Sequence, residues 1–389
     1  MTTPSRSPAS HEPEAQLPQE GSETGPPWWR DRSRWRWFTG MVVAFGLGAA
    51  ANTVAIPYVI FEPGPAVDVL GTETVDGEDR LRIQIEQAPT YPTTGQLDFT
   101  TVLLRGGPGR SVTVVDVVAA WLDPESDVYD YEQIYPPQVT REEVDEFNRV
   151  QMATSQQTSV VVALRALGRE VPEIVTVTRV AEGASGDALQ AGDVLVSVAG
   201  RPVDDHRVLR ERIEQTAAGV PIEVVVERDG QQVALHPMTR SADDGRTVLG
   251  IVLGVDYELP FPVTIDADNV GGSSAGLMFS LGVYDRLTEG ALTGGQRIAG
   301  TGTISQSGEV GPIGGIAQKL VGAQRAGAAY FLAPADNCAE VVGREPDGLA
   351  VVPVASFEEA RHAVTEIAGG RGVDLPRCTA TEGHPSQQG

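Results

Sequence analysis

Apolar and polar positions follow two different patterns along the chain. Alternation with a period of two predicts strands at 80–87 and 97–104. Residues 141–167 have the spacing of one or two helices, and the apolar run 112–122 fits either a helix or a buried strand. Alternating strands and helices return between about 246 and 370. The pattern therefore predicts an α+β protein.

The middle of the chain has a different pattern of predicted elements. Residues 168–245 predict a strand, a turn of small residues, a second strand, an amphipathic helix and two further strands. This short β-rich order differs from the flanking segments 62–167 and 246–370. We therefore expect residues 168–245 to form a separate domain.

One apolar run lies near the N-terminus. Residues 38–60 contain no charge and would form a helix about 35 Å long, enough to cross a bilayer. Four arginines precede the run, which predicts a single-pass anchor with a disordered cytoplasmic leader (1–37) and everything after Ile60 outside the cell membrane. The alternative is a cleaved signal peptide with its small-residue site at 49–51. The polar tail, 371–389, is expected to be disordered.

Composition narrows the classes of function. The 389 residues carry a net charge of −24, which argues against nucleic acid as a partner because phosphate binding needs basic patches. Cys338 and Cys378 are the only cysteines, and neither lies in a metal-binding spacing, so we expect no metal. Outside the cytoplasm the two could pair or stay independent, since sequence does not give their distance.

Lys319 is the only lysine, and the other 28 of the 29 basic residues are arginine. An arginine stays protonated in a protein, whereas a lysine can lose its proton when its surroundings lower its pKa. Of the five histidines, only His362 lies in the segment 246–370, so a Ser-His-Asp triad is poorly supported. Lys319 is the better candidate for a base.

A turn rich in glycine and serine lies before a predicted apolar helix, 45 residues ahead of Lys319. Backbone N–H groups at the start of a helix can stabilise an oxyanion. Ser274 is therefore a candidate nucleophile, and Gly272, Ser273 and Ala275 are candidates for the turn that holds the oxyanion. Most such turns carry no chemistry, so this feature alone does not decide the function.

Two motifs resemble those of the Lon proteases. Ser274-Ala275-Gly276 before an apolar helix resembles the family's nucleophile motif, and residues 311–327 resemble its catalytic-lysine segment around Lys319. Residues 298–304 resemble the strand whose threonine contacts that lysine, at Thr301. The resemblance covers about 250 to 370, and the helix at the end of 141–167 resembles the first helix of the same fold. It implies the Lon proteolytic fold, which is that of the second domain of ribosomal protein S5.

Two positions depart from the Lon pattern. Ser273 stands where the family has proline, which raises the question of which serine attacks, and the motif register favours Ser274. Gly271 stands where an aspartate is common, which removes one electrostatic element of the site.

The middle segment resembles the PDZ fold around residues 188–205. PDZ domains bind extended peptides as an added strand, and the carboxylate-binding loop would fall near Leu167 and Gly168, although no GLGF motif is written there. The alternative is a small β-rich domain without a ligand. The anchor, the PDZ segment and the Lon-type segment together are similar to the YlbL-like Lon peptidases, with the PDZ domain inserted into the proteolytic fold.

The resemblance implies peptide-bond hydrolysis through an acyl-enzyme, with Ser274 as nucleophile and Lys319 as general base. Burial must lower the pKa of Lys319 by ~3 units, or about 4 kcal/mol. Because Gln318 and Leu320 flank the only lysine, the chain has no Walker A loop, and we expect an ATP-independent enzyme without cofactor or nucleotide. The expected partners are protein or peptide substrates and the lipid bilayer, with a homo-oligomer left open. The alternative functions are an inert scaffold that binds protein C-termini and a pyridoxal-type lysine enzyme.

Overall fold

The computed structural model of the protein describes residues 32–75, 77–181, 188–267 and 270–379. Most of the expected leader and the end of the expected tail therefore lie outside the described residues. The chain divides by its internal contacts into two units, which are residues 1–55 with 113–115, and the remainder.

The first unit contains helix α1 (Arg32–Ala51), which ends well short of the expected boundary at Ile60. Strand β2 begins instead at Tyr58, and Val59 and Ile60 are fully buried in the second unit. Pro57 has no backbone N–H, so it cannot continue a helix. The prediction of one helix over 38–60 was thus wrong in its last part, because a core strand and a membrane helix have the same apolar composition. Within the described residues, no helix is both long enough and apolar enough to cross a membrane.

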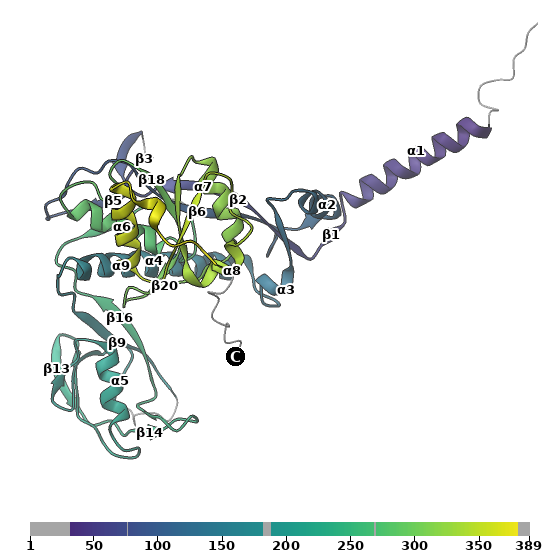
Figure 1. The fold of residues 1–389 in the computed structure, drawn as a ribbon. Coiled ribbons are helices and arrows are strands. Elements are labelled where there is room, and N and C mark those ends of the chain that lie inside the picture. Colours follow the sequence, from purple (N-terminus) through teal and green to yellow (C-terminus); the bar gives the residue numbers. More distant parts are fainter. Residues whose placement is uncertain (1–31, 76, 182–187, 268–269, 380–389) are drawn as a thin grey trace, which may run out of the picture. The chain divides into compact units, whose positions relative to one another are not determined.

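A mixed six-stranded sheet forms the centre of the second unit (Figure 1). Strand β6 pairs in parallel with β18 and antiparallel with β2, and β18, β21 and β22 are mutually parallel. The strands in spatial order are β22 (Ala350–Val354), β21 (Tyr330–Pro334), β18 (Arg297–Gly300), β6 (Gln96–Arg105), β2 (Tyr58–Asp68) and β8 (Asp127–Asp130). The strand predicted at 97–104 is β6. Because the sheet takes strands from both sides of the middle segment, that segment interrupts the larger fold.

Helices cover both faces of this sheet. The main core cluster joins one face to α4 (Arg141–Ala166), α6 (Gly276–Leu287) and α9 (Phe357–Ala368). A second cluster joins the other face to α7 (Ile316–Arg325) and α8 (Cys338–Val341). The ambiguous run 112–122 is mostly helix α2 (Val114–Leu122), and a short helix α3 (Tyr131–Ile134) follows β8.

The middle segment folds around its own core. Its sheet has the order β13-β12-β10-β9-β16, with β11 beside β10, and α5 packs against it (Figure 1). The bounds are β9 (Glu173–Val180), β10 (Val194–Val198), β11 (Arg201–Pro202), α5 (His206–Glu214), β12 (Val224–Arg228), β13 (Gln231–Leu235) and β16 (Ile251–Tyr257). Since β16 pairs with β9, this PDZ-like segment (173–257) extends beyond residue 245, where we expected it to end.

Five pairs of short strands complete the fold. The predicted strand at 80–87 is divided between two of them, β4 and β5. The pairs are β1 (Ala55–Ile56) with β7 (Val112–Thr113), β3 (Thr72–Val75) with β4 (Glu78–Leu81), β5 (Ile83–Ile85) with β17 (Val263–Ile265), β14 (Arg240–Ser241) with β15 (Thr247–Val248), and β19 (Thr303–Ile304) with β20 (Val310–Gly311).

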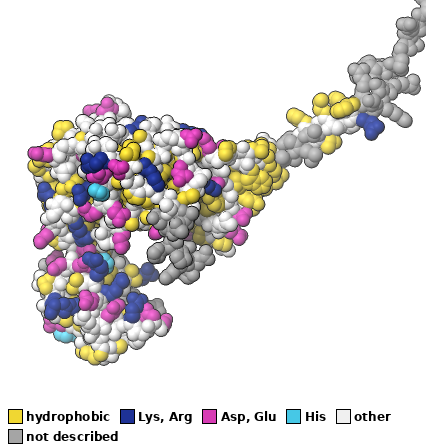
Figure 2. All heavy atoms as spheres, viewed as in Figure 1, with side chains coloured by type: hydrophobic (Ala, Val, Ile, Leu, Met, Phe, Trp, Pro, Cys, Tyr) yellow, Lys and Arg dark blue, Asp and Glu magenta, His cyan; other side chains and the backbone are white. Residues whose placement is uncertain are grey.

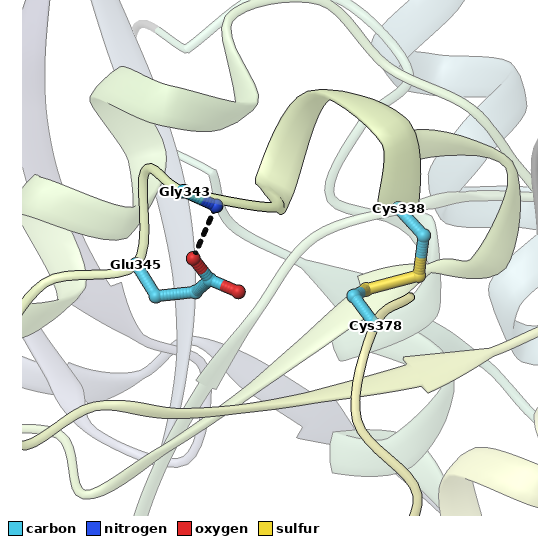
Figure 3. Close-up of a disulfide and its surroundings, with 4 residues drawn as sticks. All are labelled: Cys338, Gly343, Glu345 and Cys378. Atoms are coloured by element: carbon cyan, nitrogen blue, oxygen red, sulfur yellow. Dashed lines mark hydrogen bonds between the residues drawn. A yellow bond between two sulfur atoms is a disulfide. The ribbon is translucent and has the colours of Figure 1, made fainter. Parts of the chain in front are cut away.

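A disulfide joins Cys338, at the start of α8, to Cys378 near the end of the described chain (Figure 3). The sequence left this pairing open. Beside it, the backbone N–H of Gly343 donates to the carboxylate of Glu345 at 2.7 Å. The disulfide connects the last described residues to the start of α8.

Candidate active site

The structure brings Ser274, Thr301 and Lys319 together. The Nζ atom of Lys319 lies 2.8 Å from Oγ of Ser274 and 2.9 Å from Oγ1 of Thr301. Thr301 in turn donates from Oγ1 to the backbone carbonyl of Ser274 at 3.0 Å. The three side chains come from the start of α6, the end of β18 and the middle of α7. They therefore form one hydrogen-bonded group, although 45 residues separate Ser274 from Lys319.

Burial decides the charge of Lys319. Lys319 is only 3 % exposed, and the buried apolar residues of α7 near it in the sequence include Ile316 and Leu320. Removal from water lowers the pKa of Lys319 to about 7. Within the described part of the chain, no carboxylate forms an ion pair with it. At neutral pH a large fraction of Lys319 is therefore the free amine.

The neutral amine has the hydrogen-bonding capacity that a base needs. With one N–H donated to Thr301, the lone pair of Nζ can accept the hydroxyl proton of Ser274. Thr301 is fully buried and uses its own proton on the carbonyl of Ser274, so its oxygen is left as an acceptor for Lys319. The arrangement can activate the Ser274 hydroxyl as a nucleophile.

Two serines of α4 hold the turn that carries Ser274. Oγ of Ser155 donates to the carbonyl of Ser273, and Oγ of Ser159 donates to the carbonyl of Gly276. A Cβ atom at Gly276 would lie 2.8 Å from Oγ of Ser155, so only glycine permits this approach. These contacts were not predicted, because they join residues more than 110 positions apart. Their one signal in the sequence is the presence of polar residues on a buried helix.

The remaining turn residues fit the oxyanion hypothesis only in part, because the N–H of Gly272 already has a partner. Gly272 has a φ of 89° and donates its N–H to the carbonyl of Asn148 on α4. Ala275 is buried and caps α6, the helix that begins at Gly276. The hydrogen bond to Lys319 is made by Ser274, while the carbonyl of Ser273 is turned toward α4.

Glycine also fixes the entry to α7. Gly315 has a φ of 68°, in the left-handed region, and a Cβ atom there would lie 2.7 Å from Cγ2 of Val102. Gly327, with a φ of 82°, follows the helix. These glycines allow α7 to lie close to β6 and carry Lys319 into the core.

A cleft opens at the Ser274–Lys319 pair. Its walls come from β2, β6, α4 and the nucleophile turn, and they include Phe61, Phe99, residues 100–104, Asn148 and Met152. Sequence reasoning did not assign these residues to the site, because nothing in their local pattern distinguishes them from core. The only histidine of the segment 246–370, His362, lies exposed on α9.

The PDZ-like segment has a second cavity. It lies between α5 and residues 246–255, which include the start of β16. Leu167 and Gly168, on which we expected the ligand loop, end helix α4 and are not among the residues that line this cavity. Leu249 and Gly250, which directly precede β16, line it instead.

One group of described residues has the composition of a metal site. Glu173, Asp205 and His206 bring potential ligand atoms within 4.8 Å of one another. However, the buried carboxylate of Glu173 already faces the guanidinium of Arg165 at 3.6 Å and bonds to Nδ1 of His206 at 2.8 Å. We therefore interpret this group as a hydrogen-bonded ion-pair network.

The segment that carries the candidate site is similar to known proteins. Residues 265–363, which contain Ser274, Thr301 and Lys319, match the family model of the Lon protease (S16) C-terminal proteolytic domain. Over this segment the chain therefore resembles the serine peptidases of the Lon type, as the motifs predicted. Similar curated proteins are Lon protease 2 of Bacillus subtilis strain 168 (31% identical over 104 residues), Lon protease of Azospirillum brasilense (35% over 97) and archaeal Lon protease of Archaeoglobus fulgidus (32% over 117).

These alignments cover only parts of the proteins. They take in 27%, 24% and 30% of this chain and 18%, 12% and 18% of the relatives, so the chain matches less than a fifth of the length of each relative. Among solved structures, PDZ domains of SdrC-like proteins from Listeria monocytogenes and Listeria innocua are 18% and 17% identical. They cover 20% and 21% of this chain and 85% and 92% of those chains, both with a TM-score of 0.20. At such TM-scores the likeness carries no argument about function.

Proposed function

We propose that the protein is an ATP-independent, membrane-anchored endopeptidase that cleaves exposed or unfolded segments of proteins outside the cytoplasm. Ser274 is the nucleophile and Lys319 is the general base. The observation that carries this proposal is the 2.8 Å contact between Nζ of Lys319 and Oγ of Ser274, in a buried site where none of the described carboxylates pairs with the amine.

The reaction follows from this contact. Oγ of Ser274 attacks the peptide carbonyl carbon as its proton passes to Nζ of Lys319, and backbone N–H groups of residues 273–275 stabilise the tetrahedral oxyanion. The N–H of Gly272 takes no part, because it is bonded to the carbonyl of Asn148. Collapse breaks the C–N bond, and the ammonium of Lys319 returns the proton to the leaving amine. Water then attacks the ester with Lys319 again as base, and Ser274 is released with the acid product. Thr301 orients the amine throughout.

Covalent labelling of the intact protein tests the assignment. A fluorophosphonate probe should label the wild type, and Ser274→Ala should lose the label. The matched control is Ser273→Ala, which removes the neighbouring hydroxyl and should keep it. Labelling that persists in Ser274→Ala, or that depends on Ser273, would overturn the choice of nucleophile.

For the membrane, we propose that α1 anchors the chain, with the N-terminus in the cytoplasm and the catalytic fold outside. The apolar side chains of Phe38, Met41 and Phe45 support this, since all three are strongly exposed on α1 and need an apolar environment. The mass of the intact protein recovered from membranes tests it. A retained residue 1 supports an anchor, whereas a chain that starts just after Ala51 would indicate a cleaved signal peptide.

The PDZ-like segment is proposed to recruit or gate substrate. An extended peptide could add to the edge of β16 opposite β9, against α5, with apolar contacts from the half-buried Ile251 and Leu253. Leu253→Arg, at a half-buried position of the cavity wall, should weaken binding of a C-terminal peptide in a fluorescence-anisotropy titration without changing the labelling of Ser274. Unchanged peptide affinity would remove this cavity from the proposal.

A further inference from the structure

Helix α2 presents an apolar face that no other described part of the protein covers. Val118, Trp121 and Leu122 have i, i+3 and i+4 spacing, and Leu122 is 82% exposed. The opposite face, with Val117 and Ala120, is buried. Figure 2 shows hydrophobic side chains gathered over this part of the surface. We call Val118, Trp121 and Leu122 the α2 patch.

The buried side of α2 fixes the patch close to the entry of the chain into the domain. Val117 and Ala120 form one apolar cluster with Ile60, and Ile56 and Tyr58 pack against it. The segment that packs against the buried side of α2 is therefore the one that follows helix α1 in the chain. Only residues 52–57 separate Ala51, the end of α1, from Tyr58. Even fully extended, this connection spans at most about 25 Å.

The length of α1 strengthens this restraint. The uncharged part of α1 runs from Trp37 to Ala51, which as a helix spans roughly 22 Å, less than the hydrocarbon core of about 30 Å. A helix that is too short for the bilayer draws its flanking residues toward the interface. The next residues, which include the exposed Val54, would occupy the outer part of the bilayer. The base of α2 is then held at the lipid surface.

The chemistry of the patch suits that position. It contains no charge, and its central residue is a tryptophan, the side chain that prefers the boundary between headgroups and acyl chains. The acidic residue of α2, Asp116, forms an ion pair with Arg105 at 2.5 Å, and Glu62 contacts the same arginine. We propose that the α2 patch lies on the outer surface of the bilayer as a second, interfacial contact. This inference rests on the proposed anchoring by α1.

The sequence supplies a reporter for the test. Trp121 is the only tryptophan after residue 37, so replacing Trp28, Trp29, Trp35 and Trp37 by phenylalanine leaves it as a single fluorophore. The full chain with this background is reconstituted in vesicles of phosphatidylcholine and phosphatidylglycerol, with or without bromine on the acyl chains. We expect a loss of Trp121 emission that is larger for bromine near the headgroup than for bromine at the chain end.

Two variants complete the design. Leu122→Asp should abolish the quenching and keep fluorophosphonate labelling of Ser274, while Val373→Asp, at another exposed valine, should change neither. Vesicles that carry the protein without quenching of Trp121 would overturn the patch and leave the anchor intact. Protein that fails to float with vesicles would overturn both. Trp121 buried in a dimer that Leu122→Asp dissociates in light scattering would assign the patch to a second copy and overturn lipid as its occupant.

Discussion

Two buried polar sites border strand β18, and each contains one basic residue. The two basic residues differ in whether a carboxylate faces them. Arg297, at the start of β18, meets the fully buried carboxylate of Asp98 with 2.6 Å between Nε and Oδ2. Lys319 meets the residue just after the end of β18, Thr301, and its side-chain partners among the described residues are hydroxyl groups. One cation is paired with an anion and the other is not.

The difference explains why one site is structural and the other can be reactive. A carboxylate holds the proton on its partner, whereas burial without an anion favours the neutral base. Burial raises the pKa of Asp98, and Arg297 opposes that rise, so each charge depends on the other. At Lys319 burial acts alone and brings the pKa to about 7. Substitutions of the basic residue or of its partner at each site test this difference.

The largest expected effect is on the chemistry of the unpaired site. Lys319→Arg keeps a positive charge but cannot lose its proton, so kcat/KM for an unstructured peptide should fall by ~10³-fold or more. The matched control is Arg325→Lys, an exposed exchange on the same helix, which should leave kcat/KM unchanged. A Lys319→Arg enzyme that retained most of its activity would contradict the mechanism.

At the paired site the expected effect is on stability. Arg297→Gln leaves the Asp98 carboxylate buried without its partner, which should lower the free energy of unfolding by ~3–5 kcal/mol in urea titrations. The loss should shrink as pH falls, because the raised pKa of Asp98 lets the carboxyl become neutral. The double variant with Asp98→Asn should recover part of the loss. A loss below ~1 kcal/mol would mean that the pair contributes no more than an exposed one.

Removing the unpaired charge should have the opposite sign. The pKa of Lys319 is about 7 in the folded protein against the ordinary lysine value of 10.5, so the unfolded chain binds more protons between these pH values. Lys319→Met should therefore raise the free energy of unfolding by up to ~5 kcal/mol below pH 7, and this gain should disappear as pH approaches 10.5. Ser274→Ala, which keeps the amine, should retain the pH dependence of the wild type. A gain that did not vary with pH would contradict this account.

The smallest expected effect comes from adding a weak partner for Lys319. Asn148 lines the same cleft, and Asn148→Asp is nearly isosteric. A new carboxylate there should raise the pKa of Lys319 by about 0.5–1 unit and move the pH midpoint of Ser274 labelling upward by the same amount. Asn148→Ala should leave the midpoint in place. A downward shift for Asn148→Asp would show that the cleft does not transmit the added charge.

Sequence alone predicted which polar side chains come together better than it predicted the elements around them. Ser274, Thr301 and Lys319 stand at positions fixed by local motifs, and all three side chains meet in the structure. The Asp98–Arg297 pair could not be foreseen, because its partners are 199 residues apart and meet only through strand pairing.

The other wrong predictions have a common physical cause. The pattern of apolar residues does not show whether an apolar surface is covered by protein, by lipid or by nothing. Val59 and Ile60 look like the end of a membrane helix but are core residues of β2. The run 112–122 is helical, yet one of its faces is exposed. The PDZ-like segment continues to Tyr257 because β16 returns to pair with β9, a contact that no local signal marks.

The central claim is that the amine of Lys319 is largely neutral near pH 7, and the composition of the chain allows a direct measurement. Because Lys319 is the only lysine, growth on lysine labelled with ¹³C at Cε gives one protein signal in an NMR titration. The account predicts a single chemical-shift inflection at a pH of about 7 in the folded protein. An inflection near the ordinary lysine value of about 10.4 would contradict it, because a protonated Lys319 could not accept the proton of Ser274.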